Sequence, residues 1–207
     1  MRWGLGLLFI TAMVLSCGCI QKINMNDVMD EIRSNVKNII NETYTDSENF
    51  KLNTGNEFIL KVGESVEYEG INVTVKNVWF SSDLRDFKTF KPIDKYFGVA
   101  EEGYEFLVAY VRIENKGNKT IYTTAHDFIV IDSQGTVYPY SVLTHAFEDK
   151  LDFKKLGENE YTEGKIVFII PKNKTKLKIA YCFGSLADFK SFFSFFKNKW
   201  AVWVVKK

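Results

Sequence analysis

The chain has 207 residues, 46% of them hydrophobic and 15% aromatic, which suits one globular domain of roughly 150 residues with additional segments. Its 27 basic and 26 acidic residues leave a net charge of +1 without a basic stripe, so the sequence carries no electrostatic signature of nucleic-acid binding. Two of its three cysteines lie in the first 19 residues, which excludes a scaffold built on disulfides for the rest of the chain.

Residues 1–19 have the organisation of an export signal. Arg2 precedes an apolar run from Trp3 to Leu15, and small residues follow that run. A helix needs about 20 apolar residues to span the hydrocarbon core of a bilayer. The run is shorter than this, so a cleaved signal is expected and a retained membrane helix is the alternative.

The end of this segment, Leu15-Ser-Cys-Gly-Cys19, resembles a prokaryotic lipobox, in which cleavage leaves a lipidated cysteine at the new N-terminus. Cys19 follows Gly18 and is the predicted lipid-attachment residue. Cys17, which follows Ser16, is the alternative. An ordinary cleaved signal with incidental cysteines is the remaining interpretation.

Residues 20–56 are predicted to form an amphipathic helix and then a polar tether. Apolar residues recur at spacings of three and four, as on one face of a helix: Met25, Val28, Met29, Ile32, Val36, Ile39 and Ile40. Asn26 is a suitable N-cap, and Asp27 favours the helix dipole in the first turn. The helix is expected to dock on its own domain or to pair with another chain. The polar stretch 41–56 would hold the domain away from the membrane.

The rest of the chain, residues 57–207, has the pattern of many short β-strands. The longest expected strand, Gly103–Asn115, places an unbroken apolar face on alternate residues from Leu107 to Ile113. Shorter strands are expected at 58–62, 65–68, 71–79, 128–131, 136–138, 161–170, 176–183 and 200–205. Two long connections, 81–102 and 141–160, separate some of them, and such loops are often functional or mobile. Glycine and asparagine turns without alternating helices predict an antiparallel β-sandwich.

Four stretches, taken in order, resemble the DUF4352 family: Val62-Gly-Glu-Ser-Val66, Tyr104–Asn115, Asp132-Ser-Gln-Gly135 and Gly164–Pro171. The resemblance covers about residues 57–183. It implies an immunoglobulin-like β-sandwich of the kind carried by bacterial and archaeal lipoproteins, similar to the fold of a secreted mycobacterial antigen. It implies a cell-surface setting but brings no agreed activity and no catalytic residues. The chain departs from the family pattern in the 81–102 connection and in its aromatic C-terminal part.

Motifs for catalysis or metal binding, such as a nucleophile elbow, a zinc-protease helix or a phosphate-binding loop, do not occur in the sequence. The chain has two histidines, His126 and His145, and only His126 has a neighbouring carboxylate, on Asp127, that could support a general base. Carboxylates suited to Ca²⁺ gather in the first long connection without the spacing of a calcium loop, so a solvated loop is expected: Asp83, Asp86, Asp94, Glu101 and Glu102. Cys182 is expected to be a buried apolar residue on a strand. We therefore predict no catalytic residues, no metal and no cofactor.

Four Asn-x-Ser/Thr sequons are candidate glycosylation sites in an exported protein: Asn41, Asn72, Asn118 and Asn173. Asn118 and Asn173 fall in predicted turns, which best accommodate a bulky sugar. Chance occurrence is the alternative. An archaeal source is expected if the sequons are used.

An aromatic segment lies near the C-terminus, between residues 186 and 197. Its apolar residues fit one face of a helix: Leu186, Phe189, Phe192, Phe193 and Phe196. The segment either caps one end of the sandwich or exposes an aromatic patch to a partner or a membrane. In the second case Lys190, Lys197 and Lys199 would flank an anionic surface.

These features together predict an exported lipoprotein at the extracellular face of the cell membrane, carrying a non-enzymatic binding or interaction domain. The expected partners are the membrane, through the lipid, and a protein at the cell surface, and nucleic acid is not expected. The oligomeric state is left open. The alternatives are a structural envelope accessory without a discrete ligand and an uncharacterised surface hydrolase.

Overall fold

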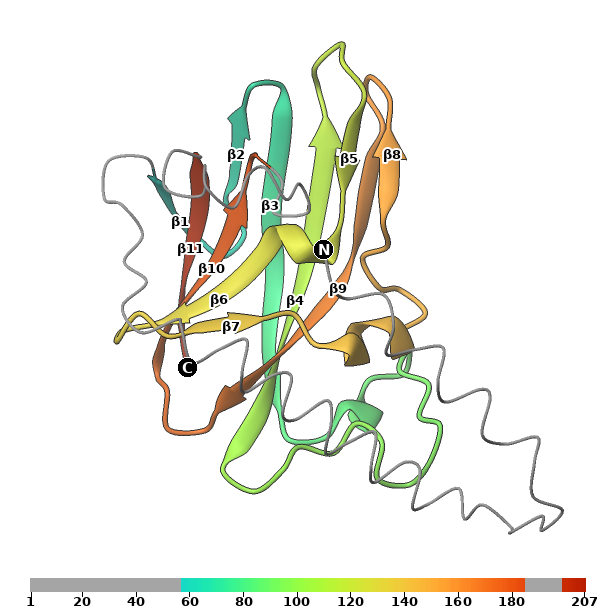
Figure 1. The fold of residues 1–207 in the computed structure, drawn as a ribbon, viewed down its shortest axis with the longest axis vertical. Helices are drawn as coiled ribbons and strands as arrows, with labels where there is room; N and C mark the ends of the chain where they lie inside the picture. The colour runs from blue at the N-terminus through green and yellow to red at the C-terminus, as the bar shows by residue number, and fades with distance from the viewer. Residues whose placement is uncertain (1–56, 185–198) are drawn as a thin grey trace, which may run out of the picture. The chain divides into compact units, whose positions relative to one another are not determined.

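The computed structural model describes residues 57–184 and 199–207. Their two larger β-sheets pack face to face (Figure 1). Sheet A contains, in spatial order, β1 (Glu57–Lys61), β11 (Trp200–Lys206), β10 (Lys176–Cys182), β6 (Phe128–Asp132) and β7 (Val137–Pro139). Sheet B contains β2 (Ser65–Tyr68), β3 (Ile71–Ser81), β4 (Tyr104–Asn115) and β9 (Tyr161–Pro171). All pairings within these sheets are antiparallel except that of β1 with β11. The predicted sandwich is confirmed, with one parallel pairing that the sequence did not indicate.

The hydrophobic core lies between the two sheets because each strand turns alternate residues inward. The apolar face predicted for β4, from Leu107 to Ile113, is fully buried there. From sheet A, β11 contributes Ala201, Trp203 and Val205 to the same core. Burying one valine, leucine or isoleucine side chain stabilises a fold by about 1.5–3 kcal/mol. The buried residues of these strands therefore hold the sandwich together.

The hairpin between β2 and β3 turns at Glu69-Gly70, as the sequence predicts. Both residues have positive φ, 51° and 79°, as a two-residue type I′ turn requires. The carbonyl of Gly70 accepts hydrogen bonds from the N–H groups of Lys116 and Gly117, at 2.7 and 3.0 Å. A Cβ on Gly70 would lie 2.7 Å from the Gly117 Cα, so the close approach of two turns also requires glycine here.

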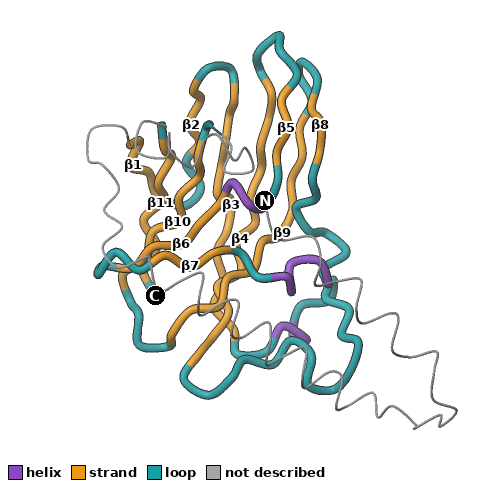
Figure 2. The backbone as a smooth tube through the Cα atoms, in the orientation of Figure 1, coloured by secondary structure: helices purple, strands orange, loops and turns teal. Residues whose placement is uncertain are grey.

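The two long connections cover the outer face of sheet B. They include the 3₁₀ turns η2 (Leu84–Asp86) and η4 (Val142–Ala146), which lie near each other in Figure 2. A second apolar cluster forms beneath them: Leu84, Phe90, Phe106, Val108, Phe147 and Val167. Lys165 of β9 donates hydrogen bonds to Thr89 at 2.9 Å and to Asp149, and so joins the two connections to the sheet. In this structure both connections serve as a cover.

A separate two-stranded sheet, β5 (Ile121–Thr123) with β8 (Lys154–Leu156), was not predicted. The 3₁₀ turn η3 (Ala125–Asp127) was also missed. Cys182 is fully buried on β10, as predicted. Among residues 57–184 and 199–207, no helix has the length and apolarity needed to cross a bilayer.

Candidate binding groove

The strands on one side of the sandwich differ in length, and this leaves two strand edges open. β2 pairs only with the first four residues of β3, whereas β3 continues to Ser81. The Gly63 N–H then donates to the Val75 carbonyl at 2.8 Å, where the β1–β2 turn crosses β3. Beyond Val75, the only strand paired with β3 in the described part of the chain is β4. Opposite it, β1 ends at Lys61, so the end of β11 is paired there only with β10.

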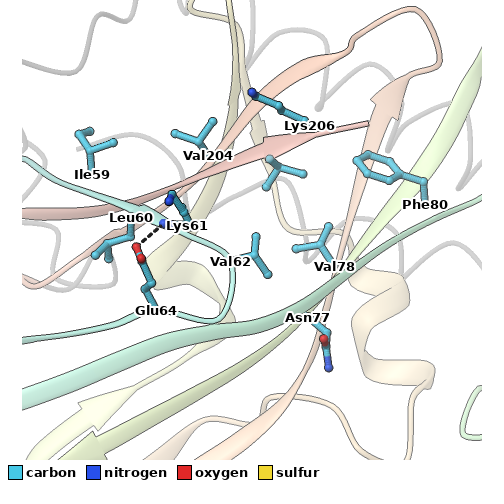
Figure 3. A pocket seen from close by; sticks show the side chains of 11 residues that line it. Ile59, Leu60, Lys61, Val62, Glu64, Asn77, Val78, Phe80, Val204 and Lys206 are labelled. Atoms are coloured by element: carbon cyan, nitrogen blue, oxygen red, sulfur yellow. Dashed lines mark hydrogen bonds between the residues drawn. The ribbon is translucent and has the colours of Figure 1, made fainter.

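A groove of about 730 Å³ lies between these two edges (Figure 3). Its lining comes from β1 and the turn after it, from β3 and from β11. Val62 and Val78 point toward each other across the groove in Figure 3. These two side chains, with Leu60 and Phe80, are half-buried and pack against the central core. The floor of the groove is therefore an apolar opening into the sandwich.

The rim of the groove carries a positive charge. Lys61 and Lys206 are exposed, and neither forms an ion pair with an acidic residue of the described segments. The Glu64 carboxylate is occupied, because it accepts the backbone N–H of Lys61 at 2.7 Å. Lys207 contacts Glu105 at 2.6 Å, with its Nζ 5.7 Å from the ring centre of Phe80. The rim is thus suited to an anionic group on a ligand.

A bulge in β3 leaves the open edge accessible. The register of β3 against β4 shifts between Val75 and Asn77, so Lys76 is the extra residue. A lysine often protects an exposed strand edge. Here the Lys76 Nζ lies 3.2 Å from Glu163 of β9, on the outer face of sheet B.

The Glu163 carboxylate also accepts a hydrogen bond from the Tyr110 hydroxyl. Burial and this hydrogen bond raise the pKa of Tyr110 to about 12, so the phenol stays protonated and acts as a donor.

His126 and His145 both contact the ring of Tyr140, an arrangement that the sequence did not predict. The Tyr140 hydroxyl is 3.0 Å from His126 Nε2, and its ring centre is 6.2 Å from that of His145. The second nitrogen of His126 faces the Thr124 hydroxyl at 3.1 Å. Burial, with a contribution from His145, lowers the pKa of His126 and favours the neutral imidazole.

The carboxylate next to His126 in sequence has another role. Asp127 accepts the backbone N–H of Thr124 at 2.9 Å and caps η3 in a capping box. Both ring nitrogens of His126 face hydroxyl groups. His126 thus contacts two hydroxyl groups, and Asp127 has a structural role at the start of η3.

The structure places the other predicted sites as follows. Asn118 and Asn173 are exposed in turns, and Asn72 is half-buried on β3 between β2 and β4. In the first long connection, Asp83 binds Arg85 and Asp94 accepts two backbone N–H groups of its own turn. Residues 57–184 and 199–207 contain no cluster of three His, Cys, Asp or Glu that could hold a metal ion. Several predicted site residues lie outside the described residues: Cys17, Cys19, Asn41, Phe189, Phe192, Phe193 and Phe196.

A family model described as "Domain of unknown function (DUF4352)" matches residues 60–188. Comparison with curated proteins finds no match. YcdA of Bacillus subtilis, named as a candidate lipoprotein, is 17% identical over 69% of this chain, with a TM-score of 0.50. This chain spans 38% of the length of YcdA.

Two smaller proteins give similar superpositions. The YjhA protein of Bacillus subtilis is 18% identical over 71% of this chain and 98% of its own, with a TM-score of 0.50. The secreted protein MPT63 of Mycobacterium tuberculosis is 11% identical over 72% of this chain and 98% of its own, with a TM-score of 0.48. The likeness to YcdA and YjhA shows a shared sandwich fold.

Proposed function

The chain belongs to the DUF4352 family of domains of unknown function, and from this premise we propose that it is an exported, lipid-anchored protein whose sandwich is a non-enzymatic binding module at the outer face of a prokaryotic cell membrane. The basic and apolar leader supports export, and the Leu15–Cys19 sequence supports lipid attachment at Cys19, with Cys17 as the alternative. The description of YcdA as a candidate lipoprotein agrees with this location.

The groove is the observation that carries the binding role. Unpaired strand edges offer N–H and C=O groups to an extended segment, a common mode of peptide recognition. The floor around Val62 and Val78 would take aliphatic side chains, and Lys61 and Lys206 would take an acidic one. The ligand we propose is thus an extended segment of a cell-surface protein, with alternating aliphatic residues and at least one carboxylate.

The lipid anchor has a direct test. The Cys19→Ser variant is expected to lose incorporation of radiolabelled fatty acid in the native host, because it lacks the thiol to which the lipid is attached. Cys17→Ser is the matched control and should be labelled like the parent. Loss of label in Cys17→Ser alone would move the anchor to Cys17. Label retained in both single variants would contradict the anchor.

The binding role is tested first by site-specific crosslinking in native envelopes. A photoreactive amino acid replaces Asn77, which is exposed on the groove rim, and in a second protein it replaces Asn118, which is exposed in a distant turn. A protein segment crosslinked at position 77 and absent at position 118 is expected. Failure to find one would favour the structural envelope role over a binding module.

The captured segment is then made as a peptide and its affinity is measured by calorimetry. Val78→Thr keeps the shape of the side chain but puts a hydroxyl on the groove floor. Left unsatisfied, this group costs about 1–3 kcal/mol, so affinity is expected to fall about 5- to 150-fold. Val142→Thr, on the exposed η4, is the control and should bind like the parent. Equal affinity of all three folded proteins would place the ligand outside the groove.

A further inference from the structure

The outer face of sheet A carries four exposed lysines, which we call the lysine face: Lys61, Lys176, Lys178 and Lys206. Lys176 of β10 is the direct register partner of Lys206 of β11. In the next row, Val204 is the partner of both Lys61 and Lys178. Because register partners point to the same side of a sheet, the four ammonium groups share one face.

The lysine face lacks the counterions that neighbouring lysines have. Like charges directly opposite each other on a sheet destabilise it, yet none of the four lysines forms an ion pair within the segments that the structure describes. At the same end of the sandwich, Lys174 is paired with Asp132 at 2.7 Å and Lys207 with Glu105 at 2.6 Å. The excess of positive charge is therefore confined to the lysine face, and an anionic partner would reduce the repulsion among these lysines.

The shape and the apolar content of this face indicate what kind of anion it takes. A hollow of about 640 Å³ is lined in part by Lys176, Lys178 and Lys206, with the hydroxyl residues Ser133 and Thr175. Two aliphatic side chains stand exposed beside the lysines: Ile59, 58% exposed, and Val204, 39% exposed. Cationic groups mixed with exposed aliphatic groups on one surface are typical of proteins that lie in the headgroup region of a membrane.

We propose that the lysine face docks the sandwich onto a bilayer surface rich in anionic lipid headgroups. The inference rests on the proposed membrane location. Lys61 and Lys206 also line the groove, so headgroups and an acidic groove ligand would compete for these two lysines. β1 is the first described strand after the N-terminal segment, so an anchored chain enters the domain beside this face. The lysines bind headgroup phosphates, while Ile59 and Val204 enter the interface between them.

Acylation of lysines tests this docking in the full-length protein with its anchor. The protein is placed in vesicles of phosphatidylcholine alone or with phosphatidylglycerol, and the modified lysines are quantified by mass spectrometry. Labelling of the four lysines is expected to fall about threefold or more with the anionic lipid and to recover in about 0.5 M salt. Three exposed lysines on the β5–β8 side should be unaffected: Lys119, Lys154 and Lys155.

Two charge-matched variants separate the lysine face from the anchor. One changes all four of its lysines to glutamine; the control changes Lys88, Lys119, Lys154 and Lys155, which are also exposed. Energy transfer from tryptophan to a dansyl lipid in anionic vesicles should fall to the neutral-vesicle level only in the first variant.

Equal energy transfer in both variants would overturn the proposal. Protection of the same lysines by inorganic phosphate or soluble polyphosphate, as strong as that by anionic vesicles, would also overturn it, because the site would then bind free anions. A failed groove experiment leaves both outcomes readable, because none of these measurements uses a groove ligand.

Discussion

The Trp203→Ala variant is expected to lose about 3–5 kcal/mol of the free energy of unfolding, the range for removing a large buried aromatic side chain. Trp203 lies on the inner face of β11, fully buried, between the register partners Leu60 and Ile179. Its indole N–H donates to the Glu64 carbonyl at 2.9 Å, across the β1–β2 turn. The substitution therefore leaves a cavity in the core and removes a bond that holds the turn. Urea unfolding followed by circular dichroism measures the loss.

Two controls separate the contributions of Trp203. Trp203→Phe keeps most of the ring volume but loses the hydrogen bond to Glu64, so a smaller loss of about 1–2 kcal/mol is expected. Trp79→Ala removes an indole that is 38% exposed and should cost less than Trp203→Ala. A loss below about 1 kcal/mol for Trp203→Ala would contradict its central position in the core.

The Gly164→Ala variant is expected to be destabilised by about 3 kcal/mol, at the upper end of the range for overpacking. A Cβ at Gly164 would lie 2.3 Å from the Lys150 carbonyl carbon and 2.4 Å from the Leu151 nitrogen. These are backbone atoms, and hydrogen bonds hold them to β9: Leu151 N–H to the Lys165 carbonyl at 2.9 Å, and Lys165 N–H to the Asp149 carbonyl at 2.7 Å. The second long connection must then move away from the sheet.

The measurement for Gly164→Ala is the melting temperature. A loss of 3 kcal/mol corresponds to a fall of about 6–12 °C for a chain of this size. Gly157→Ala is the matched control, because its added Cβ would meet only the flexible Glu160 carboxylate, at 3.3 Å, and its melting temperature should change little. Equal melting temperatures for the two variants would mean that the backbone of Lys150 and Leu151 lies farther from Gly164 than it does in the structure.

Local sequence predicted those parts of the fold that depend on local periodicity. The alternation from Leu107 to Ile113 is a property of one strand, and Glu69-Gly70 is a complete turn signal by itself. β5 and β8 were missed because strands of three residues are too short to show a period. The sequence does not indicate that the long connections cover sheet B, because the apolar residues that do so are irregularly spaced within them.

The groove and the lysine face could not be predicted in this way. Both depend on the pairing of β1 with β11, which join opposite ends of the domain sequence, and on the point where β2 ends. Val78 is an ordinary apolar strand residue in the sequence, and only the missing strand beside it makes it part of a groove. The contacts of His126 and His145 with Tyr140 also depend on the tertiary fold, because the two histidines lie on different 3₁₀ turns.

The parallel pairing of β1 with β11 has a mechanical consequence. Five register pairs join the two strands, from Glu57–Trp200 to Lys61–Val204, and the chain enters the domain at Glu57. A tension applied at Glu57 along the strand loads the evenly spaced ladder bonds together, in shear, and does not open them one at a time. β1 would hold as a unit and then slip free as a unit. The antiparallel remainder of the sandwich would stay closed while β1 alone was released.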